Sequence, residues 1–172
     1  MMLDLSNASS RKEVFSLVED FMIKNGFTIV DKDFDRPWGG FLVIDEEQAR
    51  RFSHFFFPTM EVALSQMVGK LSPKILMVEP GKRLSWQYHH RRAEIWKLVA
   101  GTAGIVRSSN DVQGQVEALQ VNKVIELPRG LRHRLVGMGD SWGMIAEIWQ
   151  HTDPEKPSNE DDIVRLEDDY GR

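Results

Sequence analysis

The sequence contains no cysteine, which restricts the metal and redox chemistry open to the chain. Without thiols there are no disulfides and no thiolate ligands, so any metal must be held by nitrogen and oxygen atoms. The chain also lacks an apolar run long enough to cross a bilayer, and its opening segment MMLDLSNASSRKEV has no apolar core behind a basic start. We therefore expect a cytoplasmic protein without a membrane partner.

The sequence has no excess of positive charge. It contains 22 Lys and Arg residues and 26 Asp and Glu residues, which give a formal net charge of -4. Nucleic-acid binding needs clustered positive charge, so no nucleic-acid partner is expected. A small anionic substrate stays open, since only its binding site has to be basic. A length of 172 residues with 41% hydrophobic residues fits one domain with one core.

A helix is predicted over residues 10–25. Ser10 can cap its amides while Glu13 reaches back, and Gly26 is placed to end it. One apolar stripe runs along this helix at the spacing of a buried face. Its members are Val14, Leu17, Val18, Phe21 and Met22.

A second helix is predicted to follow Asp45, with Gln48 at the capping-box position and Pro58 as the stop. Between the two helices, RPWGGF at residues 36–41 indicates an extended segment and a turn. Residues 59–71 fit no element clearly.

From residue 73 onward, short apolar runs alternate with glycine, proline and polar clusters. This texture is typical of many short strands in an antiparallel barrel or jelly roll. The runs are KILMV, IWKLVAG, TAGIV, QVEALQV, KVIELP and GMIAEIW.

Metal-binding residue types gather in the segment 81–101. Gln87 and His89 are two residues apart, a spacing that points both side chains to one face of a strand. The HRRA segment after them can make a turn, which would return Glu94 on the neighbouring strand. A later turn in PRGLRHRL would let a second hairpin bring His133 across the barrel.

Together these residues offer an amide oxygen, two imidazoles and a carboxylate. That set suits one borderline divalent cation, with zinc ahead of manganese, cobalt and iron, and leaves positions open for water or substrate. A lone histidine on a strand is more often structural, but four suitable residues at linked spacings favour a metal site at Gln87, His89, Glu94 and His133.

The same segment resembles the first motif of the cupin superfamily. Gly81, His89, Glu94 and Gly101 occupy motif positions, and Gln87 replaces the first histidine. This replacement argues against an iron oxygenase. The second motif is met by proline, glycine and histidine in PRGLRH, although its leading and closing positions hold Asn122 and Gly137.

A closer resemblance is to the isomerase domain of type II phosphomannose isomerases, which are commonly fused to a mannose-1-phosphate guanylyltransferase. Residues 36–41 are similar to that domain's opening motif, 84–96 to its metal-site motif and 160–172 to its terminal signature. Glutamine at position 87 is what this family has. No nucleotide-binding glycine loop precedes the cupin region, so nucleotide transfer is not expected.

The resemblance implies a mainly β fold, a double-stranded β-helix (cupin jelly-roll barrel) with N-terminal α-helices. We expect residues 1–172 to form a single cupin domain. Within it, residues 1–58 are a helical extension, 73–151 the barrel core and 152–172 a signature tail. A homodimer stays open, with the N-terminal helices covering an edge or an interface.

The implied activity is metal-dependent interconversion of mannose 6-phosphate and fructose 6-phosphate, or of a close aldose–ketose pair, through an enediol. Glu147 is a candidate base, with a buried carboxylate paired with an arginine as the equal alternative. Arg92 is a candidate for steadying the enediolate or the phosphate. The alternative for Arg92 is a solvated charge in a turn, and the resemblance favours function.

Candidate phosphate contacts are Lys74, Ser85, Arg132 and Arg165. For Arg165 a structural role is equally supported, and for Arg172 a structural pairing within the tail is favoured. His54, His90 and His151 complete no ligand spacing. The competing function is a cupin that binds a sugar or sugar nucleotide in polysaccharide synthesis without catalysis.

Overall fold

The computed structural model describes residues 3–8 and 10–172, so Met1, Met2 and Ser9 of the predicted 1–58 extension lie outside the described residues. The helices are α1 (Arg11–Lys24), α2 (Ala49–Phe56) and α3 (Glu61–Ser65), with 3-10 turns at Glu46–Gln48 and Pro58–Met60. The strands are β1 (Ile29–Arg36), β2 (Gly39–Ile44), β3 (Lys74–Val78), β4 (Trp86–Tyr88), β5 (Arg92–Ala100), β6 (Ala103–Ser108), β7 (Glu117–Ala118), β8 (Val124–Leu127), β9 (Arg132–Gly137), β10 (Gly143–His151) and β11 (Val164–Glu167).

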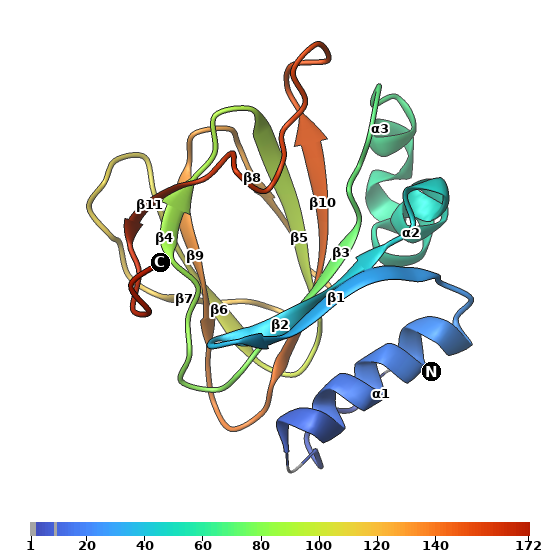
Figure 1. Ribbon diagram of the computed structural model, residues 1–172, viewed down its shortest axis with the longest axis vertical. Coiled ribbons are helices and arrows are strands. Elements are labelled where there is room, and N and C mark those ends of the chain that lie inside the picture. Colours follow the sequence, from blue (N-terminus) through green and yellow to red (C-terminus); the bar gives the residue numbers. More distant parts are fainter. Residues whose placement is uncertain (1–2, 9) are drawn as a thin grey trace.

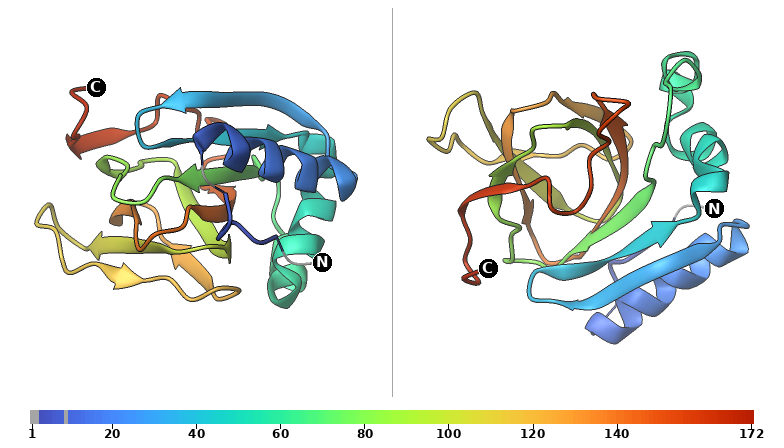
Figure 2. Two further views of the ribbon diagram at one scale, coloured as in Figure 1. Left: turned by 90° about the horizontal axis from the view of Figure 1, so that it is seen from below. Right: turned by 45° about the horizontal axis from the view of Figure 1, so that its top comes forward.

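The strands form two antiparallel sheets that face each other as a jelly-roll barrel (Figure 1). One sheet has the order β1-β2-β3-β10-β5-β8 and the other β11-β4-β9-β6-β7. Figure 2 shows α1 on the outer side of β1 and β2, away from the barrel interior, and β11 beside β4. The expected mainly β cupin barrel with N-terminal helices is confirmed.

The first helix begins and ends close to where the sequence predicts. The hydroxyl of Ser10 accepts a hydrogen bond from the amide of Glu13 at 3.2 Å, and Gly26 follows the helix with a positive φ of 78°. The predicted apolar stripe is wrong at Leu17, which is 36% exposed. Phe15 is buried instead, because its ring stacks on that of Phe34 in β1 at 4.3 Å.

The second helical segment is capped differently from the prediction. Asp45 accepts from the amide of Glu47 at 3.0 Å and starts a 3-10 turn. The amide oxygen of Gln48 accepts from the backbone of Thr28 at 2.7 Å, so Gln48 ties two segments together rather than closing a capping box. The helix ends at Phe56, before Pro58, as expected.

One strand prediction needs correction. Of the run 115–121, only Glu117–Ala118 is strand. The predicted signature tail adds a strand to the smaller sheet, because β11 pairs with β4 and places Arg165 opposite Gln87. The predicted turn in RPWGGF is confirmed as the hairpin between β1 and β2. Gly39 is required there, since a Cβ would lie 1.9 Å from the carbonyl oxygen of Met77.

Side chains on each strand alternate between the barrel interior and the surface under the helices. On β3, Leu76 and Val78 belong to the interior cluster, whereas Ile75 and Met77 belong to the cluster that α1 and α2 cover. The alternation therefore gives the protein two apolar layers, one on each side of the larger sheet.

The same alternation sets the position of the site. The apolar interior cluster consists of Leu76, Val78, Trp96, Leu98, Ala103, Ile105, Leu127, Leu135 and Ile145. The next inward positions lie two residues before Leu76 and Trp96 and two residues after Ile145. They are occupied by Lys74, Glu94 and Glu147, all of them buried. The barrel interior is thus apolar at one end and charged at the other.

Among the helices that the structure describes, none combines the length and the apolar character needed to cross a membrane.

Candidate metal centre

The charged end of the barrel encloses a cavity between the two sheets. Its wall brings together residues from the β1–β2 hairpin, β3, β4, β5, β10 and the C-terminal segment. The lining residues include Arg36, Trp38, Phe41, Lys74, Leu76, Leu84, Ser85, Gln87, Arg92, Glu94, Trp96, Glu147, Trp149, Glu160, Ile163, Arg165 and Arg172.

Two buried imidazoles that face the cavity-lining Glu94 are held in the same tautomer. Nδ1 of His89 lies 2.7 Å from the carbonyl oxygen of Asp162, and Nδ1 of His133 lies 2.9 Å from that of Leu131. A carbonyl oxygen only accepts hydrogen bonds, so each Nδ1 must carry the proton. The lone pair of each neutral ring is therefore on Nε2, the atom that a metal needs.

Both Nε2 atoms face the carboxylate of Glu94. His89 Nε2 lies 3.1 Å from Oε1 and His133 Nε2 lies 3.3 Å from Oε2. Neither His133 Nε2 nor Glu94 Oε2 has a hydrogen-bond partner, although both are buried. Burial alone would raise the pKa of Glu94, but positive charge on His89, hydrogen bonds from His133 and His89 when their Nε2 atoms are protonated, and the charge of Arg92 hold it well below its usual value, so the carboxylate is charged. Positive charge at the Nε2 side of the two rings, from a proton or from a metal ion, is thus what the carboxylate requires.

This arrangement fits a divalent cation. Lone pairs of neutral imidazoles facing a carboxylate repel unless a positive charge lies between them, and unpaired buried polar atoms are costly. Ligand atoms about 2.0–2.1 Å from a tetrahedral zinc ion lie roughly 3.3 Å apart, and the two nitrogen–oxygen distances above are 3.1 and 3.3 Å. His89, Glu94 and His133 form a buried group that could hold a metal ion.

The ligand strands are arranged differently from the prediction. Glu94 does not return on the strand next to β4, because β5 lies in the other sheet. The chain from His89 to Glu94 therefore crosses the barrel. His133 is likewise not brought by a hairpin, since β8 pairs with β5 while β9 pairs with β4 and places His133 opposite Gln87. The group forms by convergence of two facing sheets.

Gln87 lines the cavity beside His133, as the ligand prediction requires. Its amide oxygen already accepts a hydrogen bond from the hydroxyl of Ser85 at 2.5 Å. Ser85 is buried and lines the same wall. The structure thus links Ser85, a candidate phosphate contact, to Gln87, a candidate metal ligand. A metal-ligating role for Gln87 stays a prediction.

Arg92 is not a solvated charge in a turn. It is 5% exposed and stacks on the Trp149 ring, with its guanidinium carbon 3.6 Å from the ring centre. Its Nε donates to Glu94 Oε1 at 2.8 Å and its Nη2 lies 3.3 Å from His89 Nε2. Arg92 is therefore a fixed cation within the candidate site.

Glu147 points into the cavity from β10. Its two oxygens accept hydrogen bonds from the indoles of Trp96, at 2.8 Å, and Trp149, at 2.9 Å. Burial, followed by the negative charge of Glu94, raises the pKa of Glu147 to about 7. The alternative of an arginine-paired carboxylate is not what the structure has, because both direct partners are indoles.

The candidate phosphate contacts divide into two groups. Lys74, Ser85 and Arg165 line the cavity. Arg132 does not, because it neighbours the inward-facing His133 on β9 and so points to the other face, where it donates to Asp111 Oδ1 at 2.8 Å. A phosphate role for Arg132 has no geometric support.

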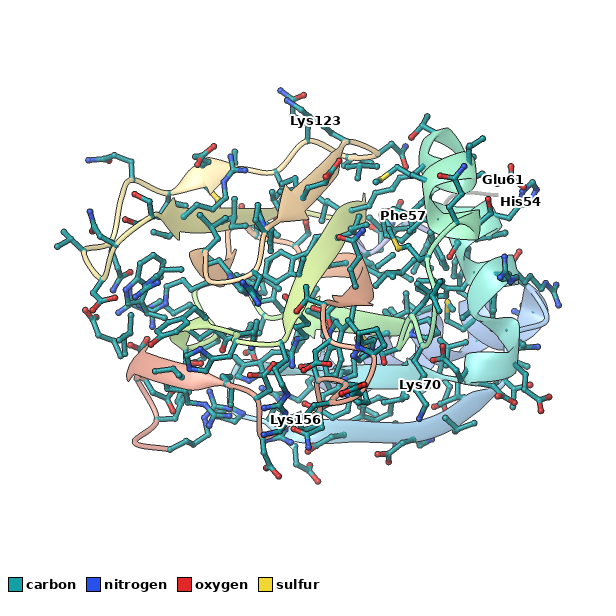
Figure 3. The ribbon with its side chains drawn as sticks, turned by 90° about the horizontal axis from the view of Figure 1, so that it is seen from above. His54, Phe57, Glu61, Lys70, Lys123 and Lys156 are labelled. Carbon is teal, nitrogen blue, oxygen red and sulfur yellow. The ribbon has the colours of Figure 1, made fainter. Side chains whose placement is uncertain are left out.

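The expected pairing within the tail is confirmed, since Arg172 donates from Nε to Asp168 at 2.9 Å. The same arginine also lines the cavity. The histidines set aside from the ligand group lie elsewhere. Figure 3 shows His54 beside Glu61 at the helices, and their side chains approach to 3.0 Å. His151 accepts at Nδ1 from the amide of Ser158 at 3.0 Å.

Sequence reasoning missed several residues that shape the site. Arg36 and Trp38 reach the cavity from the β1–β2 hairpin, although their motif indicated a turn and a family resemblance without naming either as a site residue. Glu160 forms an ion pair with Lys74. Asp162 holds His89 through its carbonyl oxygen. Membership of the terminal signature was the one available signal for Glu160 and Asp162.

Comparison with known proteins assigns the family. Residues 62–168 match the family described as mannose-6-phosphate isomerase C-terminal. A mannose-1-phosphate guanylyltransferase of Salmonella montevideo is 30% identical over 98% of this chain and 30% of its own length. The xanthan biosynthesis protein XanB of Xanthomonas campestris is 34% identical over 80% of this chain and 23% of its own length. This chain thus spans less than a third of these curated relatives.

Solved structures agree on the fold. The capsular polysaccharide assembling protein CapF of Staphylococcus aureus superposes with a TM-score of 0.55 at 17% identity, over 91% of this chain and 37% of CapF. The likeness at this identity concerns the double-stranded β-helix alone. Because the family match covers more than half of the chain and the barrel carries the expected motifs, the chain belongs to the mannose-6-phosphate isomerase C-terminal family of cupins.

Proposed function

We propose that the chain is a metal-dependent isomerase that interconverts mannose 6-phosphate and fructose 6-phosphate, or a closely related aldose–ketose phosphate pair. The observation that carries the proposal is the buried group of His89, Glu94 and His133 opening onto a cavity that also holds Glu147. Family membership supports a sugar-phosphate substrate, and the cations Lys74 and Arg92 at the same cavity support an anionic one.

His89, Glu94 and His133 would hold the metal, with Gln87 as the further candidate ligand. Zinc suits these nitrogen and oxygen donors. When bound, such an ion supplies positive charge that polarises a carbonyl or hydroxyl oxygen. The carbonyl groups that fix Nδ1 of each histidine keep Nε2 turned toward the Glu94 carboxylate.

Aldose–ketose isomerisation moves a proton between neighbouring carbons. The base that moves it works best when its pKa lies near the working pH, here neutral. Glu147 meets this requirement, because burial brings its pKa to about 7. The two indole donors fix the orientation of its carboxylate. Glu147 would take the proton from one carbon and return it to the next, and Arg92 would stabilise the negative charge that develops on the oxygens.

The test is conversion of fructose 6-phosphate to mannose 6-phosphate by purified protein, before and after chelation and after zinc, cobalt or manganese is restored. We expect turnover that chelation abolishes and metal restores. The variant His133→Ala should lack it, whereas His90→Ala, at an exposed histidine, should keep it. If metal-loaded wild type gives no turnover with either sugar phosphate, the proposal fails.

A second candidate is a sugar-binding cupin without catalysis. The observation that favours it is the position of Arg92, whose guanidinium already contacts Glu94 Oε1 and His89 Nε2. A cation from the chain itself can therefore neutralise the carboxylate. This candidate predicts sugar-phosphate binding that is unchanged by a chelator, together with no product. Metal content of the purified protein, measured by mass spectrometry beside the turnover assay, separates the two functions.

A further inference from the structure

The cavity contains a buried cation that is neutralised by an exposed carboxylate. The side chain of Lys74 is 8% exposed, whereas that of its ion-pair partner Glu160 is 70% exposed. The Lys74 ammonium lies 4.2 Å from the ring centre of Trp149 and 5.5 Å from that of Phe41. In the part of the chain that the structure describes, Glu160 is the one acidic side chain in ion-pair contact with Lys74.

The main chain around Glu160 is fixed. The carbonyl oxygen of Asn159 accepts from Arg92 Nη1 at 3.0 Å. On the other side, the buried carboxylate of Asp162 accepts from the amides of His90 and Arg91 at 3.0 and 2.9 Å. The backbone is thus anchored on both sides of Glu160, but its exposed side chain can rotate into water without disturbing these anchors.

The residues around Lys74 favour binding of an external anion once the Glu160 carboxylate has rotated away from the ammonium. Arg36, Arg165 and Arg172 line the same cavity as Lys74. Arg165 makes no ion pair with any described residue. A phosphate monoester carries about -1.5 to -2 charges near neutral pH and offers three strong acceptor oxygens. Such a group can replace the single charge of a carboxylate and still satisfy the buried ammonium.

We infer that Glu160 is an internal counter-ion of Lys74, and that its carboxylate occupies the position where the substrate's phosphate group binds. The carboxylate must therefore be displaced from Lys74 when the substrate binds. This inference rests on the proposed function for the identity of the ligand as a sugar phosphate. Leaving a buried ammonium without its ion-pair partner is costly. A neutral sugar cannot supply the replacement charge, so the Glu160–Lys74 pair disfavours unphosphorylated sugars and selects phosphate esters.

The test compares two variants that remove the same charge from adjacent exposed positions, Glu160→Gln and Asp161→Asn. Asp161 has no ion-pair contact with Lys74 or with any other described cation, so its variant reports the change in net charge alone. Binding of inorganic phosphate, fructose 6-phosphate and fructose is measured by calorimetry at constant ionic strength. Each titration is run before and after chelation, which separates phosphate bound at Lys74 from phosphate bound through a metal.

We expect Glu160→Gln to tighten both phosphate ligands by about tenfold, the effect of roughly 1.4 kcal/mol of competition. Asp161→Asn should stay within about twofold of wild type, because exposed charges are screened. Fructose binding should not tighten in either variant. Thermal unfolding of Asp161→Asn should match wild type, since Asp161 is exposed and pairs with no described cation. Glu160→Gln should unfold at a lower temperature in the absence of ligand, because the buried Lys74 loses its ion-pair partner, and added phosphate should reverse that loss.

The inference is overturned if Glu160→Gln binds phosphate no more tightly than Asp161→Asn, or more weakly, as it would if Glu160 helped to hold the ligand. Its failure is separable from that of the isomerase proposal. Tighter phosphate binding by Glu160→Gln without turnover in wild type would support the counter-ion inference and contradict the isomerase proposal. Turnover in wild type with unchanged phosphate binding by Glu160→Gln would support the isomerase proposal and contradict the counter-ion inference.

Discussion

Replacing Asp162 by asparagine is expected to destabilise the fold and to weaken the metal site together. The Asp162 side chain is buried at 3% exposure. It accepts hydrogen bonds from the amides of His90 and Arg91 and from the hydroxyl of Ser158 at 2.6 Å. Burial alone would raise its pKa, but these donors lower the pKa to about 2. The charged form is therefore the one that the fold stabilises.

The size of the effect follows from this shift. Lowering the pKa from 3.8 to about 2 corresponds to roughly 2 kcal/mol of folding free energy. Because the folded pKa is depressed, that contribution is fully present above pH 4 or so and disappears as the pH falls through about 2. For a chain of this length 2 kcal/mol lowers Tm by about 4–8 °C. The carbonyl group of the same residue orients His89, so a shift of this segment should also weaken zinc binding by about tenfold.

The assay is denaturant unfolding of wild type, Asp162→Asn and the exposed control Asp161→Asn between pH 7 and pH 3, with zinc affinity measured by competition with a chelator. We expect the free-energy gap between wild type and Asp162→Asn to be full at pH 7 and to narrow below pH 4, while the control follows wild type. A gap that does not change with pH would refute the assignment of the stabilisation to the Asp162 carboxylate. An equal loss in the control would refute the burial argument.

Three further outcomes are expected. His133→Ala should lower the zinc content at least tenfold, measured by mass spectrometry, while His90→Ala retains it. Glu147→Gln should lower kcat by about 10²- to 10⁴-fold, and wild-type turnover should fall as the pH drops through about 7, because the base becomes protonated; a wild-type rate that is flat from pH 6 to 8 would contradict the role of Glu147. Arg11→Met should destabilise the protein by about 2–4 kcal/mol and raise amide exchange in the β1–β2 hairpin, because Arg11 donates to three carbonyl groups there and pairs with Glu79; Lys12→Met should do neither.

The sequence allowed the centre of the site to be predicted because its members obey local rules. His89 and Glu94 lie in one motif, and strand alternation places Glu147 on the interior side of its strand together with Trp149. The wrong step was the pairing of strands. Local spacing indicates that a chain turns after His89, but it does not indicate whether the next strand joins the same sheet or the facing one. In the structure β5 joins the facing sheet.

Contacts across long stretches of sequence were beyond prediction for a related reason. Glu160 and Asp162 lie in an acidic, proline-containing segment whose composition indicates a solvated arm. Their partners Lys74 and His89 are more than seventy residues away. Neither periodicity nor composition encodes such a pairing. The family-like terminal signature was informative because it marked the segment as special without giving its contacts.

The two buried carboxylates of the cavity show how neighbours, rather than depth, divide the chemical roles. Glu94 and Glu147 are almost equally buried, at 2% and 5% exposure. Glu94 faces two imidazoles and the guanidinium of Arg92, which together outweigh the cost of burial and hold its pKa well below the usual value. For Glu147, burial and then the negative charge of Glu94 raise the pKa to about 7, and its two direct partners are neutral indoles that do not offset this. Environments that separate two carboxylates in this way suit one of them to hold charge and the other to exchange a proton. The same strand alternation that buries both side chains therefore assigns Glu94 to cation binding and leaves Glu147 as the group able to act as the base.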